Sequence, residues 1–238
     1  MSLADILAQL MPHLIVAPVL LPLATAALLL LLGTRRRSLA AALSVLSCGL
    51  GLAVSIALVY WVQHNGTPQT VGVYLPANWQ VPYGIVLVVD RLAAMMLLLT
   101  SVLGLAAVIY ALPRWDRAGA RFHPLFQLQL MGLAGAFVTA DLFNLFVFFE
   151  IMLAASYGLL LHSSSEARVR SGLHYIAINL LASTLILIGV AVLYGITGSL
   201  NLADMASMVP AVPDTDRGLL HAGAAVLAIR AHMGAERP

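Results

Sequence analysis

Lysine is absent from this sequence of 238 residues, only 9% of the residues are charged, and there is a single cysteine. A soluble domain carries about 25% charged residues, whereas 61% of this chain is hydrophobic and its mean hydropathy is +0.97. These values exclude a soluble globular protein. Because one cysteine cannot form an internal disulfide, Cys48, which lies within an apolar run, is interpreted as a packing residue.

The scarcity of charge also limits the classes of ligand and partner. All twelve basic residues are arginines and the formal net charge is +2, which is too small for a nucleic-acid-binding surface. The sequence contains no phosphate-binding loop, CxxC, HExxH or nucleophile motif. We therefore expect no nucleic-acid partner, no cofactor, no metal site and no enzyme activity, and the remaining chemistry is the binding of protons or cations.

Long apolar runs dominate what is present. A helix needs about 20 apolar residues to cross a bilayer core of about 30 Å. Six runs approach or reach this length: Leu14–Leu32, Leu39–Val62, Leu92–Ala111, Phe122–Thr139, Leu142–Leu161 and Leu173–Ile196. They predict an all-α polytopic membrane helix bundle of about six transmembrane helices, forming a single transmembrane domain over residues 1–238. The fourth run is the weakest, and we expect a helical hairpin with the fifth run to shelter its Gln127 and Gln129 from lipid.

A seventh apolar run begins at Leu219 and reaches only Ile229 before Arg230. About eleven residues are too few to cross a bilayer, so this run predicts a partial seventh helix, followed by an atypical tail over residues 230–238. Either the half-span lies against the other helices or the chain is a truncated piece of a longer protein. We favour truncation.

The arginines predict the orientation of the chain. Eight of the ten arginines before position 230 follow the first, third or fifth run, whereas the intervening loops hold only Arg91 and Arg217. The positive-inside rule assigns the arginine-rich side to the cytoplasm, so the N-terminus is expected to be extracytoplasmic. The segment from His64 to Gly84, rich in Gly, Pro and aromatic residues, is interpreted as an extracytoplasmic loop that could contain a short hairpin.

One carboxylate, Glu150, lies deep within the fifth run, eight residues from Leu142 and eleven from Leu161, or roughly 12 and 16 Å from the two ends. An intramembrane carboxylate is costly to insert and is by default a candidate functional residue. Because loss of water disfavours its charged form, it suits the uptake and release of a proton. Ala154 and Gly158 share its face and indicate a packed position. The alternative is a structural carboxyl that bonds to a neighbouring helix.

Five further polar residues are candidates for a proton path: Asp141, Tyr157, His174, Asn179 and Ser183. Asp141 suits either a helix N-cap or ion access. Asn179 and Ser183 share a face of the sixth run next to Tyr175, where hydrogen bonding between helices is an equal alternative. His174 could relay protons or lie at the membrane interface.

Three stretches carry a resemblance to a known family: DLFNLFVFFEIMLAASYGLLLH (Asp141–His162), VVDRLAAMMLLLTSVLGLAAVIYA (Val88–Ala111) and GLHYIAINLLASTLILIGVAVLYGITGSLNLADMA (Gly172–Ala206). They resemble the fifth, third and sixth helices of the D-type subunits of Mrp/Pha-type multisubunit cation/proton antiporters, which are related to the antiporter-like proton-pumping subunits of respiratory complex I. The Glu150 motif is the most specific of the three.

The resemblance implies a secondary transporter subunit in a bacterial inner membrane. It would work with other membrane subunits to exchange cytoplasmic Na⁺ or K⁺ for external protons. In that family the glutamate matched by Glu150 pairs with a lysine on the seventh helix, and a second, inverted bundle of five helices follows. This sequence has no lysine and stops within the seventh run, so we expect the chain by itself not to catalyse antiport. Two alternatives remain: a proton-pumping subunit of a complex I-type NADH:quinone oxidoreductase, and a non-functional structural membrane fragment.

Overall fold

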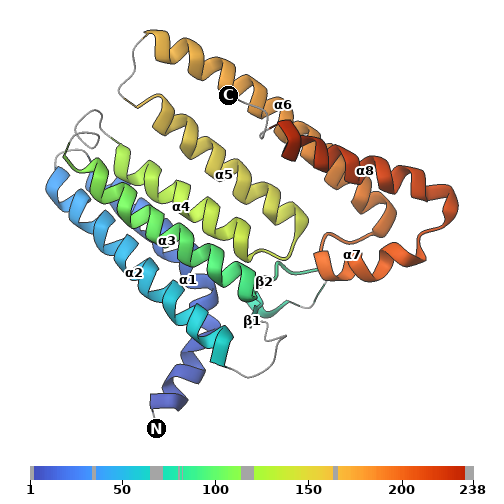
Figure 1. Cartoon of the computed structure of the whole chain (residues 1–238), viewed down its shortest axis with the longest axis horizontal. Coiled ribbons are helices and arrows are strands. Elements are labelled where there is room, and N and C mark those ends of the chain that lie inside the picture. Colours follow the sequence, from blue (N-terminus) through green and yellow to red (C-terminus); the bar gives the residue numbers. More distant parts are fainter. Residues whose placement is uncertain are drawn as a thin grey trace.

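The structure, a computed structural model, describes residues 3–33, 36–64, 72–79, 81, 83–113, 121–162 and 166–233. It is an all-α bundle of long helices that run antiparallel to their neighbours in the sequence (Figure 1). The first six helices are α1 (Leu3–Leu32), α2 (Arg37–His64), α3 (Arg91–Ala111), α4 (Phe122–Val138), α5 (Leu142–Leu160) and α6 (Glu166–Thr197). Each contains one of the apolar runs, so the predicted fold class is confirmed.

Five of these helices, α1, α2, α3, α5 and α6, are long and apolar enough to cross a membrane. The fourth, α4, has 17 residues, or about 26 Å, and is the shortest of the six, as its sequence indicated. Only 28% to 39% of the residues in the most apolar stretch of each longer helix are buried within the chain. The remaining apolar surface requires lipid or neighbouring subunits, as expected of a multi-pass membrane protein.

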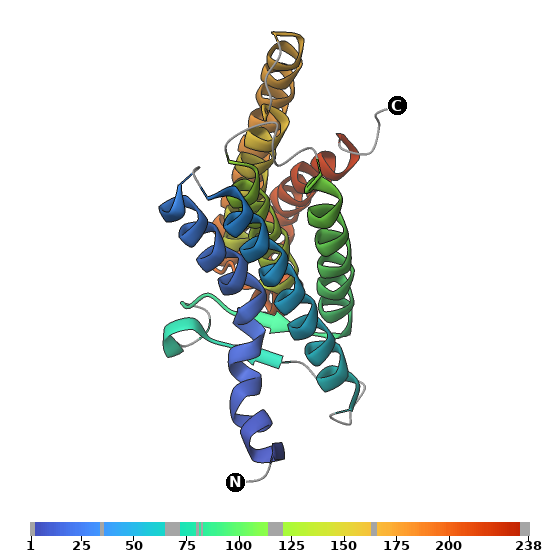
Figure 2. The same cartoon turned by 90° about the vertical axis from the view of Figure 1, so that its left-hand side faces the viewer.

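A two-stranded antiparallel sheet lies between α2 and α3. Its strands, β1 (Gly72–Tyr74) and β2 (Leu87–Val89), pair Gly72 with Val89 and Tyr74 with Leu87, and a short 3₁₀ helix, η1 (Pro76–Asn78), lies between them. The hairpin is therefore present, although its second strand follows the segment in which it was expected. Leu87 and Val89 join the buried core with residues of α1 and α2, so this end of the bundle is partly closed by strands (Figure 2).

The chain after α6 forms α7 (Leu202–Met208), a short 3₁₀ helix η3 (Val209–Ala211) and α8 (Asp214–Met233). The last helix has 20 residues, so it is longer than the eleven-residue partial helix that was predicted. It lies along α6 (Figures 1 and 2), and a Cβ at Gly189 of α6 would be 3.1 Å from the carbonyl oxygen of Gly223. The seventh run thus packs against the other helices. Residues 234–238 of the tail lie outside the described part of the chain.

Helix ends follow from local sequence signals. Asp90 caps α3, because its Oδ1 accepts a hydrogen bond from the backbone N–H of Ala93 at 2.7 Å. Gly33 and Gly198 end α1 and α6 with positive φ angles of 66° and 70°, a conformation that glycine adopts without a Cβ penalty. These signals fix the helix lengths that set the depth of each side chain in the membrane.

Gln127 of α4 is fully buried and ties α4 to α2. Its Nε2 donates hydrogen bonds to Oγ of Ser44 at 3.0 Å and to Sγ of Cys48 at 3.6 Å. Its Oε1 accepts from Ser47 at 3.3 Å, and Ser47 in turn accepts from Thr25 of α1 at 3.0 Å. The expectation that α5 shelters Gln127 is therefore wrong, because the partners of this amide lie on α2. Cys48 is buried, as predicted.

Candidate functional site

The turn between α4 and α5 fixes where α5 begins. Asp141 is the N-cap of α5, and its Oδ1 accepts a hydrogen bond from the N–H of Asn144 at 2.7 Å. The side-chain amide of Asn144 donates to Oγ1 of Thr139 at 2.9 Å. Asp141 thus has the capping role that its sequence position allowed, and no observation assigns it a part in ion access.

Backbone hydrogen bonds hold the same turn on two sides. The N–H of Ala140 donates to the carbonyl of Val86, beside β2, at 2.9 Å, and its carbonyl accepts from the N–H of Leu202 at 2.9 Å. The N–H of Leu142 donates to the carbonyl of Leu200 at 2.8 Å. The start of α5 is therefore anchored to the hairpin and to the start of α7, which restricts rotation or sliding of α5.

Glycines let α4 and α5 pack closely. A Cβ at Gly132 would lie 2.8 Å from the backbone nitrogen of Met152 and 2.9 Å from the carbonyl oxygen of Phe148. At Gly135 an added Cβ would collide with the ring of Phe148. Small residues at such crossings allow close contact between helices in membranes, so the position of α5 is set on its α4 side by main-chain contact.

Glu150 lies near the middle of α5, eight residues after Leu142 and ten before Leu160, or about 12 and 15 Å from the two ends. Its side chain is half-buried, and its Oε1 accepts a hydrogen bond from the hydroxyl of Ser183 on α6. Ser183 is itself 4% exposed. The structure therefore joins two of the residues singled out in the sequence, which are 33 positions apart and lie on neighbouring helices.

Polar residues continue from Ser183 along one face of α6. Asn179, one turn earlier, donates from Nδ2 to the carbonyl of Tyr175 at 2.9 Å. The ring of Tyr175 meets the ring of Tyr157 of α5 edge-on, with centroids 5.8 Å apart. Because α5 and α6 are antiparallel, the tyrosine pair lies about two helical turns from the Glu150–Ser183 pair.

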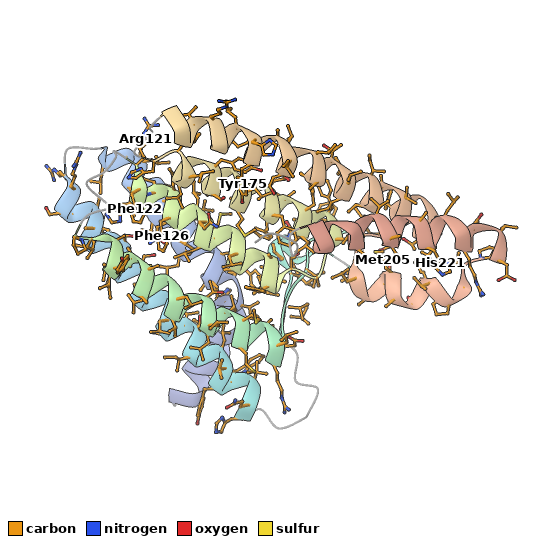
Figure 3. The ribbon with its side chains drawn as sticks, turned by 45° about the horizontal axis from the view of Figure 1, so that its top comes forward. Arg121, Phe122, Phe126, Tyr175, Met205 and His221 are labelled. Atoms are coloured by element: carbon orange, nitrogen blue, oxygen red, sulfur yellow. The ribbon has the colours of Figure 1, made fainter. Side chains whose placement is uncertain are left out.

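An open pocket lies beyond the tyrosines, between α4, α5 and α6. It leaves about 710 Å³ for the centres of water molecules and is lined by Phe126, Gln129, Ser156, Leu159, Leu160 and Tyr175. The Oε1 of Gln129 is buried and has no hydrogen-bond partner among the described residues. Figure 3 places Phe126 and Tyr175 at the same end of the bundle as Arg121. This pocket faces the arginine-rich end.

The remaining predicted residues differ in their positions. His174 is exposed on α6, and the described structure gives it no contact with Glu150. Ala154 is also exposed, so the described helices of this chain do not cover it as the sequence predicted. Gly158 does pack closely, since a Cβ there would lie 2.9 Å from Leu125.

Ser156 was not singled out in the sequence. Gln129 was expected to be sheltered by the fifth run, and it does lie beside Ser156, Leu159 and Leu160 of α5 with its Oε1 buried.

The described residues contain no cation paired with Glu150. The one ion pair among them joins Arg217 and Asp214 at 3.0 Å on the exposed part of α8. The same residues also contain no group of three or more His, Cys, Asp or Glu side chains that could hold a metal ion. In the described part of the chain, the chemistry of the site is that of one carboxyl group with a hydroxyl donor.

Described arginines lie at two opposite ends of the bundle. Arg36, Arg37, Arg121 and Arg170 are exposed at the end where α2, α4 and α6 begin, and Arg91 lies at the opposite end, where α3 begins. Arg35, Arg114 and Arg117 lie outside the described residues. The alternation inferred from the sequence therefore corresponds to two ends of one bundle.

Comparison with known proteins identifies relatives along most of the chain. Residues 139–235 match the family model described as NADH:quinone oxidoreductase/Mrp antiporter, TM. The chain is 52% identical over 218 residues to the D-type subunit of a probable K(+)/H(+) antiporter of Rhizobium meliloti (strain 1021), and the match covers 91% of this chain and 40% of that protein. It is 40% identical over 207 residues to the D-type subunit of the Na(+)/H(+) antiporter of Alkalihalophilus pseudofirmus, with 86% of this chain and 41% of that protein covered.

The fold also has a counterpart among solved structures. A chain in the Mrp complex from Dietzia sp. DQ12-45-1b superposes with a TM-score of 0.81 at 34% identity, and the match covers 92% of this chain and 40% of that one. The chain thus spans about 40% of the length of these relatives, and its similarity to them extends over nearly all of its own residues.

Proposed function

Because the chain belongs to the NADH:quinone oxidoreductase/Mrp antiporter family, we propose that it is a subunit of a multisubunit antiporter that exchanges Na⁺ or K⁺ for protons. Glu150 is the proton-binding residue in this proposal. The observation that carries it is the placement of a carboxyl group at mid-membrane depth with one hydroxyl donor, Ser183, from the neighbouring helix. A carboxyl in this position can bind a proton from one side and release it to another.

Polar groups on α5 and α6 are proposed to connect Glu150 to the arginine-rich end. Water in the pocket beside Tyr175 would bring protons to the level of Tyr157 and Tyr175, and Asn179 and Ser183 would continue the path to the carboxyl. The buried Oε1 of Gln129 supports water in this pocket, since a buried acceptor without a protein partner is costly unless water satisfies it. The proposed path does not use His174 or Asp141, whose part in proton transfer stays a prediction from the sequence.

The proposed orientation sets the arginine-rich end in the cytoplasm and the N-terminus outside the cell. Cysteine labelling tests it in a Cys48→Ala background, with two exposed positions at opposite ends of the bundle. A membrane-impermeant maleimide added to intact spheroplasts is expected to label Trp79→Cys and to leave Arg121→Cys unlabelled until the cells are opened. The reverse pattern would contradict the orientation.

Partner subunits are proposed to cover part of the exposed apolar surface. Within the described residues the long helices bury less than two-fifths of their most apolar stretches, and the relatives are named as subunits of antiporters. The proposal therefore concerns the chain assembled with the other membrane subunits of such a complex, in a bacterial inner membrane.

Removal of the Ser183 hydroxyl tests the site directly. Ser183→Ala is expected to lower cation-dependent proton movement by about tenfold, because a hydrogen bond to a charged group contributes roughly 1.5–3 kcal/mol and the proposed path loses its last polar group. The measurement is dye-reported collapse of a pH gradient on addition of Na⁺ or K⁺ to everted vesicles that carry the assembled complex.

Thr184→Ala is the matched control for that experiment. Thr184 is the next residue on α6, is exposed, and its hydroxyl bonds only to the carbonyl of Leu180 on its own helix at 2.9 Å. We expect Thr184→Ala to retain the wild-type rate. Ser183→Thr keeps a hydroxyl group, and its rate is expected to lie between those of Ser183→Ala and the wild type. Equal rates for Ser183→Ala and the wild type would refute the proposed role of the hydroxyl.

A further inference from the structure

A second polar region lies between α1, α2, α3 and α4, away from the contact of α4 with α5. It surrounds a partly open cavity that leaves about 40 Å³ for the centres of water molecules. A water molecule needs roughly 10–15 Å³ of such space and two to four polar partners. The cavity therefore has room for two or three waters, and whether it holds them depends on its walls.

Four helices contribute to these walls, and three of them supply polar side chains. Ser47 and Cys48 come from α2, Thr100 and Ser101 from α3, and Gln127 from α4. Ser101 shares a hydrogen bond of 2.8 Å with Ser55 of α2, which leaves its second lone pair available. Cavities lined only by apolar side chains stay dry, and this one differs from them in having hydroxyl, thiol and amide groups on three helices.

Two prolines of α1 leave a backbone carbonyl group that needs a hydrogen-bond donor. Pro18 and Pro22 both line the cavity, and both lie within an apolar, membrane-spanning stretch of α1. Proline has no N–H, so Pro22 cannot donate to the carbonyl of Pro18, four residues earlier, as a helical residue would. In membrane helices such freed carbonyls are satisfied by neighbouring side chains or by ordered water.

The nearest side-chain hydroxyls on α1 and α2 are already engaged. Thr25 donates to the carbonyl of Leu21 at 2.8 Å and contacts Ser47. Ser47 donates to Oε1 of Gln127, and both hydrogens of the Gln127 amide point at Ser44 and Cys48. The hydrogen bonds of Thr25, Ser47 and Gln127 therefore go to partners other than the proline carbonyl, and the cavity leaves room for water as a donor.

We propose that this cavity between α1, α2, α3 and α4 is a hydration site, in which two or three waters link the carbonyl of Pro18 to the polar groups of α2, α3 and α4. The site is separate from Glu150. Water here would satisfy the backbone of α1 at its prolines and would join the four N-terminal helices through a polar contact that lipid cannot replace.

Cys48 reports on this site because it lines the cavity and is the only cysteine of the chain. The S–H stretching band lies in a spectral window free of other protein absorption, so its conversion to S–D in D₂O follows one residue. In the full 238-residue chain in lipid nanodiscs, we expect Cys48 to exchange at least about tenfold faster than the backbone amides of the helices, whose exchange requires opening of the structure.

Filling the cavity should slow the exchange of the Cys48 thiol. Gly51 lines the cavity, and a Cβ at this position meets only Cδ2 of Leu21, at 4.0 Å, so Gly51→Val places its methyl groups in the space assigned to water. We expect its Cys48 exchange to be slower than that of the wild type by about tenfold or more. The control is Gly49→Val, at a position on the same helix where an added Cβ meets nothing within 4 Å; it should exchange like the wild type.

Two results would overturn the proposal. One is an exchange of the wild-type Cys48 thiol that is no faster than the exchange of the helical amides, which indicates a dry cavity. This result needs only the wild-type protein. The other is a Gly51→Val protein that melts like the wild type and exchanges Cys48 at the wild-type rate. Should Gly51→Val fail to fold, Gly51→Ala, which adds a single methyl group, is expected to give a smaller slowing in the same direction.

Discussion

We expect Glu150→Gln to reduce the proposed cation-dependent proton movement of the assembled complex to the background of vesicles that lack it. Glutamine preserves the size of the side chain and can still accept a hydrogen bond from Ser183, but it cannot bind and release a proton. Every other Asp or Glu in the described residues lies at or near a helix end or in α7 or α8, so no neighbouring carboxyl takes over the proton. The loss is therefore expected to be complete.

The assay is collapse of a pH gradient in everted vesicles after addition of Na⁺ or K⁺, at equal amounts of complex in the membrane. Glu150→Asp is the matched control, because it keeps the carboxyl group and shortens the side chain by one methylene. We expect partial activity from this variant. A Glu150→Gln complex that exchanges cations and protons at the wild-type rate would remove the carboxyl from the mechanism.

The second large effect is expected at the crossing of α4 and α5. Gly132→Val introduces side-chain atoms where the backbone of α5 approaches, with the nitrogen of Met152 2.8 Å and the carbonyl oxygen of Phe148 2.9 Å from an added Cβ. Because main-chain atoms cannot rotate away as a side chain does, the two helices must separate. Overpacking of this kind costs about 1–3 kcal/mol, and in a chain of this size each kcal/mol lowers the melting temperature by about 2–4 °C.

Thermal melting of the detergent-solubilised chain, followed by fluorescence-detected size exclusion, measures this change. Gly195→Val on α6 is the control, since an added Cβ at Gly195 meets nothing within 4 Å and the substitution changes helix propensity by the same amount. The expected result is a lower melting temperature for Gly132→Val alone. Equal melting of the two variants would show that close contact at Gly132 does not position α5.

Hydropathy was sufficient to predict the helices because a bilayer imposes one length on every span. The six apolar runs all became helices, and the weakest run became the shortest helix. The run after Leu219 was underestimated, since a helix that lies against α6 is not limited to its apolar residues: α8 begins at Asp214 and includes Arg217. The pairing of β1 with β2 and the backbone hydrogen bonds of the α4–α5 turn depend on segments that are distant in the sequence, so no local sequence pattern predicts them.

The site was predictable in its residues and only partly in its geometry. Glu150 is conspicuous as a carboxylate in an apolar run, and Ser183 lies on a polar face of α6, but their contact depends on the register of two antiparallel helices. Gln127 is a similar case. Its position in the apolar run was evident from the sequence, but its hydrogen-bond partners on α2 could not be inferred from spacing within α4.

The resemblance to antiporter subunits implied a lysine partner for the glutamate, and the sequence contains no lysine. In the structure the hydrogen-bond donor to Glu150 is the hydroxyl of Ser183. That the chain without partner subunits does not catalyse antiport stays a prediction, and the vesicle assay on the chain alone tests it.

The central claim is that Glu150 binds and releases a proton, and infrared difference spectroscopy of the purified chain in lipid nanodiscs tests it most directly. As the pH is changed, a protonated carboxyl produces a C=O stretching band that a carboxylate lacks. We predict a pH-dependent band that is present in the wild type and absent from Glu150→Gln. Identical difference spectra for the two proteins would show that Glu150 does not exchange a proton with the solution, and would contradict the claim.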